Sequence, residues 1–377
     1  MNITVLGAGL VGGPIALDLS KDYNVSLVDI NQNQLNITKE KNEQIHTIAK
    51  DLSNKNTLIE IIKDADFVIN AVPGFMGFET LKTIIESKKN VVDIAFFPED
   101  PFQLDELAKQ NNVIAIMDMG VAPGMSNLLT GYAHHLLNKT TRADTYVGGL
   151  PVVREWPYEY KAVFSPIDVI EEYTRPARYV ENGEMVIRPA LSDPEFMNFE
   201  SIGTLEAFNS DGLRSLADTI DCPNMKEKTL RYPGHIQKMS VLRETGFFSK
   251  DPININGQMI SPLEFTSKLL FPKWKLEEGE KDLTVMKIIV EGEKDNQKLR
   301  YSYDLLDYYC TETSVHSMAR TTGYAATMAA RMIIKGLYKQ IGLSVPEYVG
   351  KYPECVKFML DGLQERNIVY KETIEAI

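Results

Sequence analysis

Short apolar runs alternate with longer polar stretches of helical length along the first 120 residues of the chain. This alternation is typical of parallel strands joined by helices that cross over from one strand to the next. The runs that we predict to be strands are 3–6, 25–28, 47–49, 67–70, 91–93 and 113–117. The pattern therefore predicts an α/β fold with a doubly wound parallel sheet of the Rossmann type, which binds its ligands at the carboxyl ends of the strands.

The periodicity changes after residue 126, where longer and partly alternating runs predict a different kind of domain. The strands expected there are 146–149, 162–164, 204–208, 283–291 and 298–303. We interpret this region as a mixed α+β domain. The stretch 317–330 that follows is rich in Ala and Met, both good helix formers, and its small side chains should let a helix pack closely against the first domain.

The turn after the first predicted strand carries a glycine pattern that is typical of dinucleotide binding. It reads Gly7-Ala8-Gly9-Leu10-Val11-Gly12 and leads into a predicted helix, 14–19. Gly7 allows a tight turn, Gly9 lets the backbone approach a pyrophosphate, and Gly12 lets the helix pack on the strand. We therefore expect these six residues to cradle a pyrophosphate at a helix N-terminus.

An acidic residue follows at the spacing that a dinucleotide fold requires. Asp29 ends the second predicted strand, about twenty residues after the glycine turn, where a carboxylate holds the ribose hydroxyl groups. Ile30 begins a stretch, 30–34, that contains no Lys or Arg, although a 2′-phosphate would require one. The predicted cofactor is therefore NAD rather than NADP.

The residues directly after the other predicted strands are further candidates for cofactor contacts, because the carboxyl ends of parallel strands line the same crevice. They are Asp51, Leu52, Ala71, Val72, Pro73, Asp93, Ile94, Gly120 and Val121.

Composition and charge limit the classes of protein to which the chain can belong. With 377 residues and 44% apolar content, it can bury the cores of two domains. A net charge of −12 without any long Lys or Arg run argues against nucleic acid and anionic membranes as partners, and is compatible with a small zwitterionic or cationic substrate. The chain contains no run of about eighteen apolar residues that would span a membrane, and its N-terminus lacks the basic leader of a secretory signal.

Cysteine and motif content exclude several kinds of chemistry. The three cysteines are too far apart for a disulfide framework or a Cys-x-x-Cys metal site, so we expect a cytoplasmic protein without a metal. None of the seventeen tyrosines has a lysine four residues later, which excludes the Tyr-x-x-x-Lys proton transfer of short-chain dehydrogenases. Ser126 and Ser165 lack the Gly-x-Ser-x-Gly turn of a nucleophilic hydrolase.

Four segments carry a resemblance to a known family. They are 118–127 (DMGVAPGMSN), 171–177 (EEYTRPA), 210–215 (SDGLRS) and 229–235 (TLRYPGH). From the first strand to the helix at Arg320, the chain resembles the saccharopine dehydrogenase superfamily, and within it the L-lysine 6-dehydrogenases.

The resemblance implies NAD-dependent oxidative deamination of the ε-amine of L-lysine to 2-aminoadipate semialdehyde, which cyclises to piperideine-6-carboxylate, with release of ammonia. It also implies that the second domain is inserted in the nucleotide-binding domain and that the protein is a homo-oligomer, either a dimer or a tetramer. We accordingly assign residues 1–125 and 312–377 to the dinucleotide-binding domain, and 126–311 to an inserted domain that binds substrate and mediates oligomerisation.

Such a reaction needs a base, because only a neutral amine can support removal of hydride from the adjacent carbon. Two candidates are Asp118, at the end of the sixth predicted strand, and His235, in a Pro-Gly-His turn of the second domain. Each has a structural alternative: Asp118 can cap the following turn, and His235 can be a buried histidine with both nitrogens bonded.

An amino-acid substrate also needs a partner for its α-carboxylate, and a guanidinium is the best suited group. The candidates are Arg175, Arg214 and Arg231, of which we favour the last two. Three arginines are too many for one carboxylate, so at least one should form an ion pair between the two domains. Glu171 or Glu172, together with Tyr173, is expected near the substrate, although the two glutamates can equally form a solvated helix end.

Two rival functions stay open. A saccharopine-forming or saccharopine-cleaving enzyme would need additional cations for the extra carboxylates of its substrate. A catalytically silent NAD-binding sensor would not need an amino-acid cradle, and the polar residues of the second domain argue against it.

Overall fold

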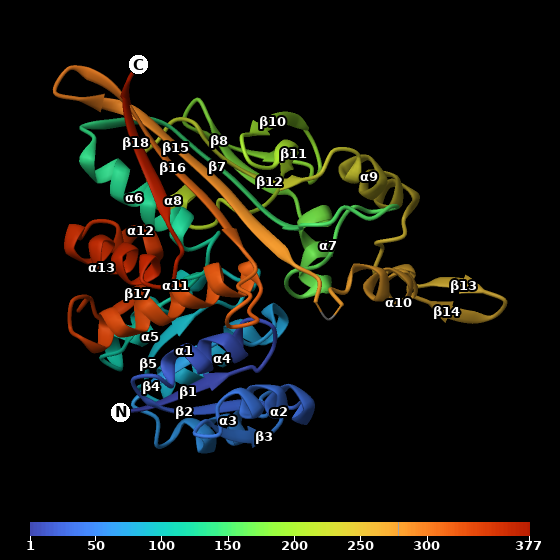
Figure 1. Ribbon diagram of the computed structural model, residues 1–377, viewed down its shortest axis with the longest axis vertical. Helices are drawn as coiled ribbons and strands as arrows, with labels where there is room; N and C mark the ends of the chain where they lie inside the picture. The colour runs from blue at the N-terminus through green and yellow to red at the C-terminus, as the bar shows by residue number, and fades with distance from the viewer. Residues whose placement is uncertain (278) are drawn as a thin grey trace. The chain divides into compact units, whose positions relative to one another are not determined.

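The computed structural model describes residues 1–277 and 279–377, which divide into two compact units. The first unit comprises residues 1–136 and 319–369, and the second comprises residues 137–318 and 370–377 (Figure 1). The chain therefore leaves the first unit, builds most of the second, and returns.

The first unit is built on a parallel sheet in the order β17-β6-β5-β4-β1-β2-β3. The strands are β1 (Asn2–Leu6), β2 (Asn24–Asp29), β3 (His46–Ala49), β4 (Phe67–Asn70), β5 (Asn90–Asp93), β6 (Ile114–Ile116) and β17 (Gly342–Ser344). The strand order reverses between β1 and β4, and such a switch point is where this fold opens its ligand crevice. The predicted doubly wound sheet is confirmed.

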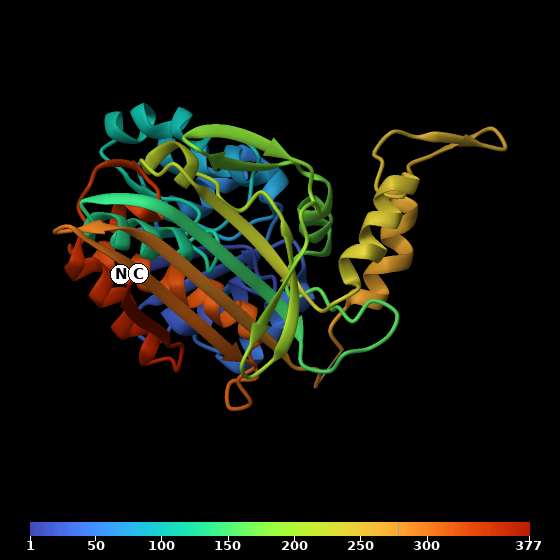
Figure 2. The ribbon, with the colours of Figure 1, turned by 90° about the horizontal axis from the view of Figure 1, so that it is seen from above.

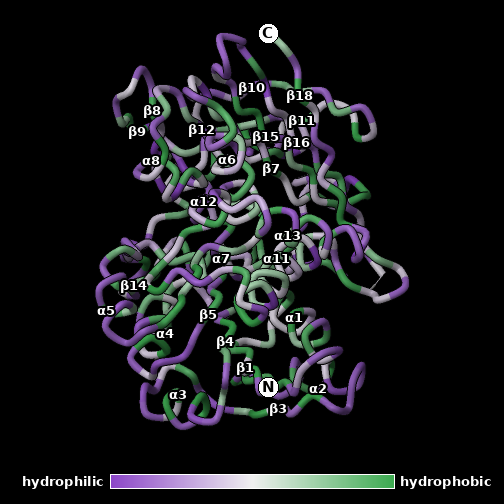
Figure 3. Tube along the Cα trace, turned by 90° about the vertical axis from the view of Figure 1, so that its left-hand side faces the viewer, coloured by the Kyte–Doolittle hydropathy of each residue, from purple (hydrophilic) through white to green (hydrophobic). Residues whose placement is uncertain are grey.

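Helices connect these strands and bury their apolar faces against the sheet. They are α1 (Gly12–Leu19), α2 (Gln32–Lys41), α3 (Lys55–Ile62), α4 (Gly74–Glu86), η1 (Pro101–Leu104), α5 (Asp105–Gln110), α6 (Met125–Leu136), α11 (Ser317–Ile334), α12 (Pro346–Val349) and α13 (Pro353–Gln364). The central strands β1, β4 and β5 are coloured as hydrophobic in Figure 3, and their apolar residues are buried. Strands covered on both faces read as continuous apolar runs, which is why the sequence pattern located them well.

The observed division of the chain differs from the predicted boundaries at residues 126–136, 312–318 and 370–377. Helix α6, which we placed in the inserted domain, belongs to the first unit, where Gly131 and Gly350 allow close contact with α12. Strand β18 (Tyr370–Ala376), which we placed in the nucleotide domain, pairs with β16 (Gln297–Tyr308) of the second unit. Helix α6 packs against α12, and β18 pairs with β16, both of them distant in sequence. The local hydrophobic pattern therefore could not show to which unit each segment belongs.

A buried carboxylate joins the first helix of the chain to the returning helices. Asp18 of α1 has no exposed side-chain surface, and its Oδ2 accepts hydrogen bonds from Arg331 Nη1 (2.7 Å) and Thr327 Oγ1 (2.7 Å) on α11. Arg366, just after α13, donates to both carboxylate oxygens at 3.0 Å. Burial opposes ionisation of Asp18, but the two arginines outweigh it, and its pKa lies below the ordinary value.

Small residues let α11 lie close to its neighbours. A Cβ atom on Gly323 would lie 3.1 Å from Ile15 of α1, and a Cβ atom on Gly362 of α13 would collide with Met328 of α11. The expected packing of this Ala- and Met-rich helix against the nucleotide-binding fold is confirmed.

The second unit contains a mixed sheet of nine strands among the described residues. Its main path runs β10-β11-β12-β7-β15-β16-β18, while β8 pairs with β12 and β9 (Figure 2). Only the pairing of β12 with β7 is parallel within this sheet. The further strands are β7 (Lys139–Pro151), β8 (Ala177–Glu181), β9 (Glu184–Arg188), β10 (Glu195–Phe199), β11 (Gly203–Asn209), β12 (Met225–Arg231) and β15 (Asp282–Lys294).

A helical group with its own core completes the second unit. It contains α7 (Pro166–Thr174), α9 (His235–Thr245) and α10 (Pro262–Trp274), and a hairpin of β13 (Ile253–Ile255) and β14 (Gln258–Ile260) joins α9 to α10. Helix α8 (Leu216–Thr219) follows β11. The core of the group is centred on Trp274, which is fully buried.

One strand prediction in the second unit is wrong. Residues 162–164 form only an isolated bridge between Ala162 and Lys275, because their apolar side chains pack into the helical core instead of pairing in the sheet. Strand β12 was missed for the opposite reason. Its sequence, with Lys226, Glu227 and Lys228 in succession, resembles an exposed segment, although Glu227 and Lys228 are buried.

None of the helices in the described part of the chain has the length and apolar character needed to cross a lipid bilayer.

Replacing Asp18 with Asn should selectively destabilise the first unit by about 3–5 kcal/mol, because it removes the buried carboxylate charge that Arg331 and Arg366 share. Urea unfolding followed by circular dichroism should show an early transition. Both tryptophans, Trp156 and Trp274, lie in the second unit, so their fluorescence provides an internal reference. The matched variant Asp22→Asn should cost less than about 1 kcal/mol, because that carboxylate is half exposed. Equal losses for the two variants would contradict the assignment.

Candidate functional site

The glycine turn of the first unit has the geometry of a pyrophosphate cradle. Gly7 has φ +98°, and a Cβ atom there would lie 2.4 Å from the carbonyl oxygen of Ala71. A Cβ atom on Gly12 would lie 2.0 Å from the carbonyl oxygen of Gly7. By contrast, a Cβ atom on Gly9 would meet no described atom within 4 Å. Gly7 and Gly12 thus shape the turn, and Gly9 leaves open the side on which a pyrophosphate approaches.

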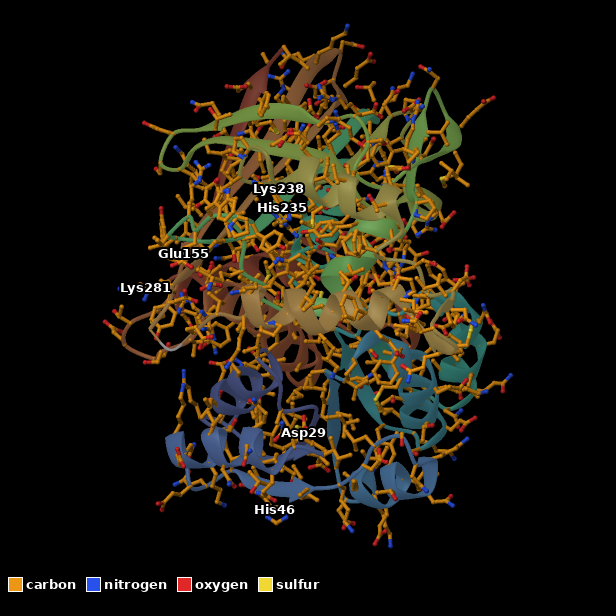
Figure 4. The ribbon with its side chains drawn as sticks, turned by 90° about the vertical axis from the view of Figure 1, so that its right-hand side faces the viewer. Asp29, His46, Glu155, His235, Lys238 and Lys281 are labelled. Carbon is orange, nitrogen blue, oxygen red and sulfur yellow. The ribbon has the colours of Figure 1, made fainter. Side chains whose placement is uncertain are left out.

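Asp29 connects this turn to the end of β2. Its Oδ2 accepts a hydrogen bond from the backbone N–H of Ala8 (2.6 Å), and its Oδ1 accepts one from Asn31 (2.7 Å). The side chain, labelled in Figure 4, is half-buried, and Ile30 beside it is 72% exposed. Asp29 therefore lies where a ribose-binding carboxylate is expected, and Leu10 and Val11 lie on the same turn as its partner Ala8.

The residues after the other strands divide into surface and buried groups. Asp51 is exposed and accepts a hydrogen bond from the Ser53 backbone (2.9 Å), which lowers its pKa. Asp93, which we expected to contact the cofactor, is fully buried and accepts from Asn70 Nδ2 (2.5 Å) and the Ala95 backbone (2.7 Å). Its side chain ties the ends of β4 and β5 together, which is a structural role.

The remaining predicted cofactor residues lie at these same strand ends. Leu52 and Val72 are buried in the first-unit core, while Pro73 precedes α4 and Ile94 follows β5. The backbone of Ala71 borders the glycine turn. Their side chains are apolar, so they would offer a cofactor nonpolar contacts and not hydrogen bonds.

Asp118 lies in a strained turn after β6. It is buried and has φ +52°, in the left-handed region that disfavours residues with side chains. A few residues later, Gly124 has φ +136°, and a Cβ atom there would collide with the backbone of Gly120, next to Val121. Strain held by surrounding structure is typical of functional positions, so this geometry is compatible with the predicted role of Asp118 as a base.

The second unit brings four of the predicted residues into one buried cluster, here called the arginine cluster: Glu172, Tyr173, Arg231 and His235. Arg231 is 2% exposed, and its Nη2 donates to Glu172 (2.6 Å) while its Nε donates to the Tyr173 hydroxyl (3.3 Å). Its guanidinium carbon lies 4.6 Å above the centre of the Tyr160 ring. Arg231 therefore forms an ion pair inside the second unit, which differs from the interdomain pair that we expected for at least one of the three arginines.

His235, labelled in Figure 4 at the start of α9, is bonded through both ring nitrogens. Nδ1 lies 2.8 Å from the carbonyl oxygen of Tyr158, and Nε2 lies 2.9 Å from the hydroxyl of Tyr173. Since a carbonyl can only accept, Nδ1 must carry the proton and Nε2 must accept from Tyr173. Burial, together with the nearby Arg231, lowers the pKa of His235 to about 3. This geometry favours the structural alternative for His235 over proton transfer.

Two further predicted substrate residues, Glu171 and Arg175, lie at the C-terminal end of α7. Arg175 Nη2 is 3.8 Å from Glu171, which also accepts a hydrogen bond from Lys250 (3.0 Å). The Glu171 carboxylate therefore has two cationic neighbours on the surface.

The loop 210–215, between β11 and α8, combines a strained backbone with an unsatisfied buried hydroxyl, neither of which occurs in the arginine cluster. Arg214 is buried with φ +53°, again in the left-handed region. Ser215 is 7% exposed, and its hydroxyl makes no hydrogen bond to any described residue, although it occupies the N-cap of α8. A strained residue next to an unsatisfied buried hydroxyl makes this loop a candidate ligand site. We predicted Arg214 from the sequence but missed Ser215, because a serine before a short helix is read as a simple cap.

No group of three or more potential metal ligands gathers in the described parts of the chain.

Comparison with known proteins identifies the family. The model of the saccharopine dehydrogenase NADP-binding domain matches residues 3–116, and that of the saccharopine dehydrogenase C-terminal domain matches residues 120–369. The chain belongs to the saccharopine dehydrogenase family. It is therefore a member of a family of oxidoreductases, and its first unit is a pyridine-nucleotide-binding domain. The resemblance noted from the sequence is confirmed at the level of the superfamily.

Several curated proteins are similar to this family member. Carboxyaminopropylagmatine dehydrogenase of Synechocystis is 25% identical over 349 residues, which cover 86% of each chain. Carboxynorspermidine synthase of Vibrio cholerae is 23% identical and is matched over 93% of its length. The α-aminoadipic semialdehyde synthases of Arabidopsis thaliana and mouse are 25% and 22% identical, but the chain spans only 23% and 46% of their lengths.

A solved structure supports the fold. Saccharopine dehydrogenase (L-Glu forming) from Saccharomyces cerevisiae superposes with a TM-score of 0.81, at 18% identity and with both chains fully covered.

Replacing Gly9 with Ala should weaken dinucleotide binding by at least about tenfold, because the new methyl group would occupy the side from which the pyrophosphate approaches. The melting temperature should stay close to that of the wild type, since the Cβ atom meets no described residue. Gly12→Ala is the matched comparison and should lower the melting temperature. Calorimetric titration with NADH provides the affinity, and an unchanged affinity of Gly9→Ala would refute the cradle.

Replacing Arg231 with Leu should cost about 3–5 kcal/mol, because it leaves Glu172 in a largely buried site without a partner. The double variant Arg231→Leu, Glu172→Leu should recover part of this loss. Fluorescence of Trp274, in the adjoining core, follows the unfolding. A variant that kept its stability and lost only substrate affinity would show instead that Arg231 is a substrate ligand.

Proposed function

We propose that the protein is an NAD-dependent dehydrogenase that removes the ε-amine of L-lysine by oxidative deamination. The geometry of the loop 210–215 carries this proposal. Arg214 is buried there in a left-handed conformation, directly before Ser215, whose buried hydroxyl makes no hydrogen bond to a described residue. Arg214 is the favoured ligand for a substrate carboxylate. One guanidinium suits the single α-carboxylate of lysine, whereas saccharopine carries three carboxylates.

Asp118 is the proposed base of the reaction. A lysine amine has a pKa of about 10.4 in water, so most of it carries a proton at neutral pH, and an ammonium has no lone pair to support loss of hydride. Asp118 would take the proton from nitrogen, and the carbon would lose its hydride, which bound NAD accepts. Asp118 then releases this proton to solvent, takes a proton from the water that adds to the iminium carbon, and gives it to the nitrogen, so that the carbon–nitrogen bond breaks to leave the aldehyde and ammonium. His235 is not used as a base, because its pKa is lowered to about 3.

NAD is the proposed coenzyme, on the basis of Asp29. A carboxylate at the end of β2 accepts hydrogen bonds from ribose hydroxyls and repels a 2′-phosphate. The segment that follows, 30–34, contains no basic residue. The alternative is NADP, which the description of the family model names. Lys50 favours this alternative, because its backbone N–H bonds to the carbonyl of Asp29 and places the residue at the end of β3.

A second candidate function is the formation or cleavage of saccharopine or a similar carboxyalkyl amine. The names of the similar proteins favour it: among them are saccharopine dehydrogenases of Pyricularia oryzae and Schizosaccharomyces pombe, 24% and 21% identical. Both candidates act on a carbon–nitrogen bond next to an amino-acid group, so they share the need for a carboxylate ligand and a base.

We further propose that the enzyme works in the cytoplasm as a homo-oligomer, with a small amino acid and no nucleic acid as its partner. The net charge of −12 supports the last point, since it would repel a polyanion.

Spectrophotometry of nicotinamide reduction separates these functions. Lysine and saccharopine are each tested with NAD and with NADP. Reduction of NAD by lysine, with ammonia released in equal amount, is the expected result. Activity with saccharopine alone would establish the second candidate, and inactivity with both substrates, together with retained binding of NADH, would indicate a non-catalytic nucleotide-binding protein.

Replacing Asp29 with Ala should raise the KM for NAD by roughly 10–100-fold, because charge-assisted hydrogen bonds to the ribose are lost. The KM for lysine should change much less. Asp66→Ala is a matched control: that carboxylate also accepts a backbone N–H, from Asn2 (2.7 Å), but it precedes β4 and so lies at the amino ends of the parallel strands, away from the carboxyl end of β2. An unchanged KM for NAD in Asp29→Ala would exclude the ribose contact.

A further inference from the structure

A buried glutamate lies directly beneath the loop 210–215. Strands β11 and β12 pair in antiparallel register, with Phe208 opposite Thr229 and Asn209 opposite Lys228. Glu227 is therefore the first residue of β12 beyond the end of β11, where the loop begins. It is 4% exposed, and the proposed mechanism does not use it.

The carboxyl group of Glu227 holds two residues of the loop. Its Oε2 lies 2.7 Å from Ser210 Oγ, which lies 2.8 Å from Thr229 Oγ1. The backbone N–H of Gly212 donates a hydrogen bond to the same carboxyl group. A Cβ atom on Gly212 would collide with Glu227, so only glycine lets the loop descend this far onto the carboxyl group.

Further hydrogen bonds fix the backbone of β12 at Glu227 and the loop at Asp211. The Tyr179 hydroxyl donates to the carbonyl oxygen of Glu227 (2.7 Å), which fixes the backbone of β12. Arg178 Nε donates to Asp211 (3.1 Å), which fixes the rim of the loop between the two residues that Glu227 holds.

The residues that follow this anchored part are the strained Arg214 and the unsatisfied Ser215. A left-handed residue persists only when the surrounding structure determines its backbone, and the anchor two residues earlier does so. We propose that Glu227 is a positioning residue, which holds the loop 210–215 so that Arg214 and Ser215 meet the α-carboxylate of the amino-acid substrate. This inference rests on the proposed function of the loop as the carboxylate site.

Burial and the charged groups around Glu227 determine its protonation state. Burial raises the pKa of Glu227 to about 8, with additional contributions from the nearby carboxylates of Glu172 and Asp211 and against the opposing hydrogen bonds from Ser210 and Gly212. Each of these carboxylates has its own cation, Arg231 for Glu172 and Arg178 for Asp211. Glu227 is therefore mostly protonated at pH 7, and it holds the loop as a neutral hydrogen-bonding group.

Three variants test the role. Glu227→Ala should raise the KM for lysine at least tenfold while the KM for NAD stays within twofold and kcat falls less than the affinity. Glu227→Gln should recover most of the lost affinity, since an amide is the neutral counterpart of the protonated acid. Glu291→Gln on β15 is the control, because it changes another poorly exposed strand glutamate that has no contact with the loop, and it should leave both constants unchanged.

The pH profile separates positioning from simple support of the fold. In the wild type, the KM for lysine should rise above about pH 8, where Glu227 loses its proton and a buried charge appears beneath the loop. The Gln variant has no proton to lose, so its profile should lack this rise. Identical profiles for the two proteins, or a wild-type KM in a folded Glu227→Ala variant, would overturn the proposal.

A measurement without substrate keeps this test independent of the proposed function. Amide hydrogen exchange of residues 209–215 should accelerate in Glu227→Ala and stay protected in Glu227→Gln, while the rest of β12 and β7 is unchanged in both. If the wild type oxidises neither lysine nor saccharopine, the proposed function fails, and the exchange data alone decide whether Glu227 orders the loop. If Glu227→Ala does not fold, Ser210→Ala removes one of the two anchors and should give the same pattern at smaller amplitude, and unaltered exchange there would refute the anchor.

Discussion

The structure of the first unit depends on one buried carboxylate. The chain leaves this unit after residue 136 and returns at residue 319, so the returning helices must find their place without a short connection to guide them. Asp18 provides this place, because a carboxylate with no exposed surface is stable only beside cations, and Arg331 and Arg366 are supplied by the returning segment. The same helix begins at Gly12, the last glycine of the nucleotide turn. Correct return of the chain and correct presentation of the cradle are therefore coupled through α1.

The arginine cluster and the loop 210–215 of the second unit differ in whether their buried polar groups are hydrogen-bonded. In the arginine cluster, the guanidinium of Arg231, the hydroxyl of Tyr173 and the ring of His235 are all joined to partners, and the direction of each hydrogen bond follows from the one before. Such a network fixes a tautomer and stabilises a core, but it offers little to a substrate. The loop 210–215 instead combines a strained backbone with an unsatisfied hydroxyl, which are costs that a protein retains where a ligand compensates for them.

Local patterns predicted the first unit better than the second, for a physical reason. A strand buried on both faces reads as an apolar run, and the glycine turn has requirements that only glycine meets, so β1, β4 and Gly7 were visible in the sequence. Strand β12 was not, because its Lys-Glu-Lys segment is buried through partners that are distant in sequence. The role of His235 was undetermined for the same reason: its type and its turn suggested catalysis, and only the positions of Tyr158 and Tyr173 show that both nitrogens are used.

The distribution of cations bears on the size of the substrate. A family that handles amino acids with different numbers of carboxylates can be expected to adjust the number of guanidinium groups that face the substrate. In this chain, Glu172 neutralises Arg231 inside the core, and this pair cannot open to receive a further carboxylate without leaving a buried charge unpaired. Under the proposed function, Arg231 would therefore not be available to the additional carboxylates of a larger substrate, and its pairing with Glu172 stabilises the fold.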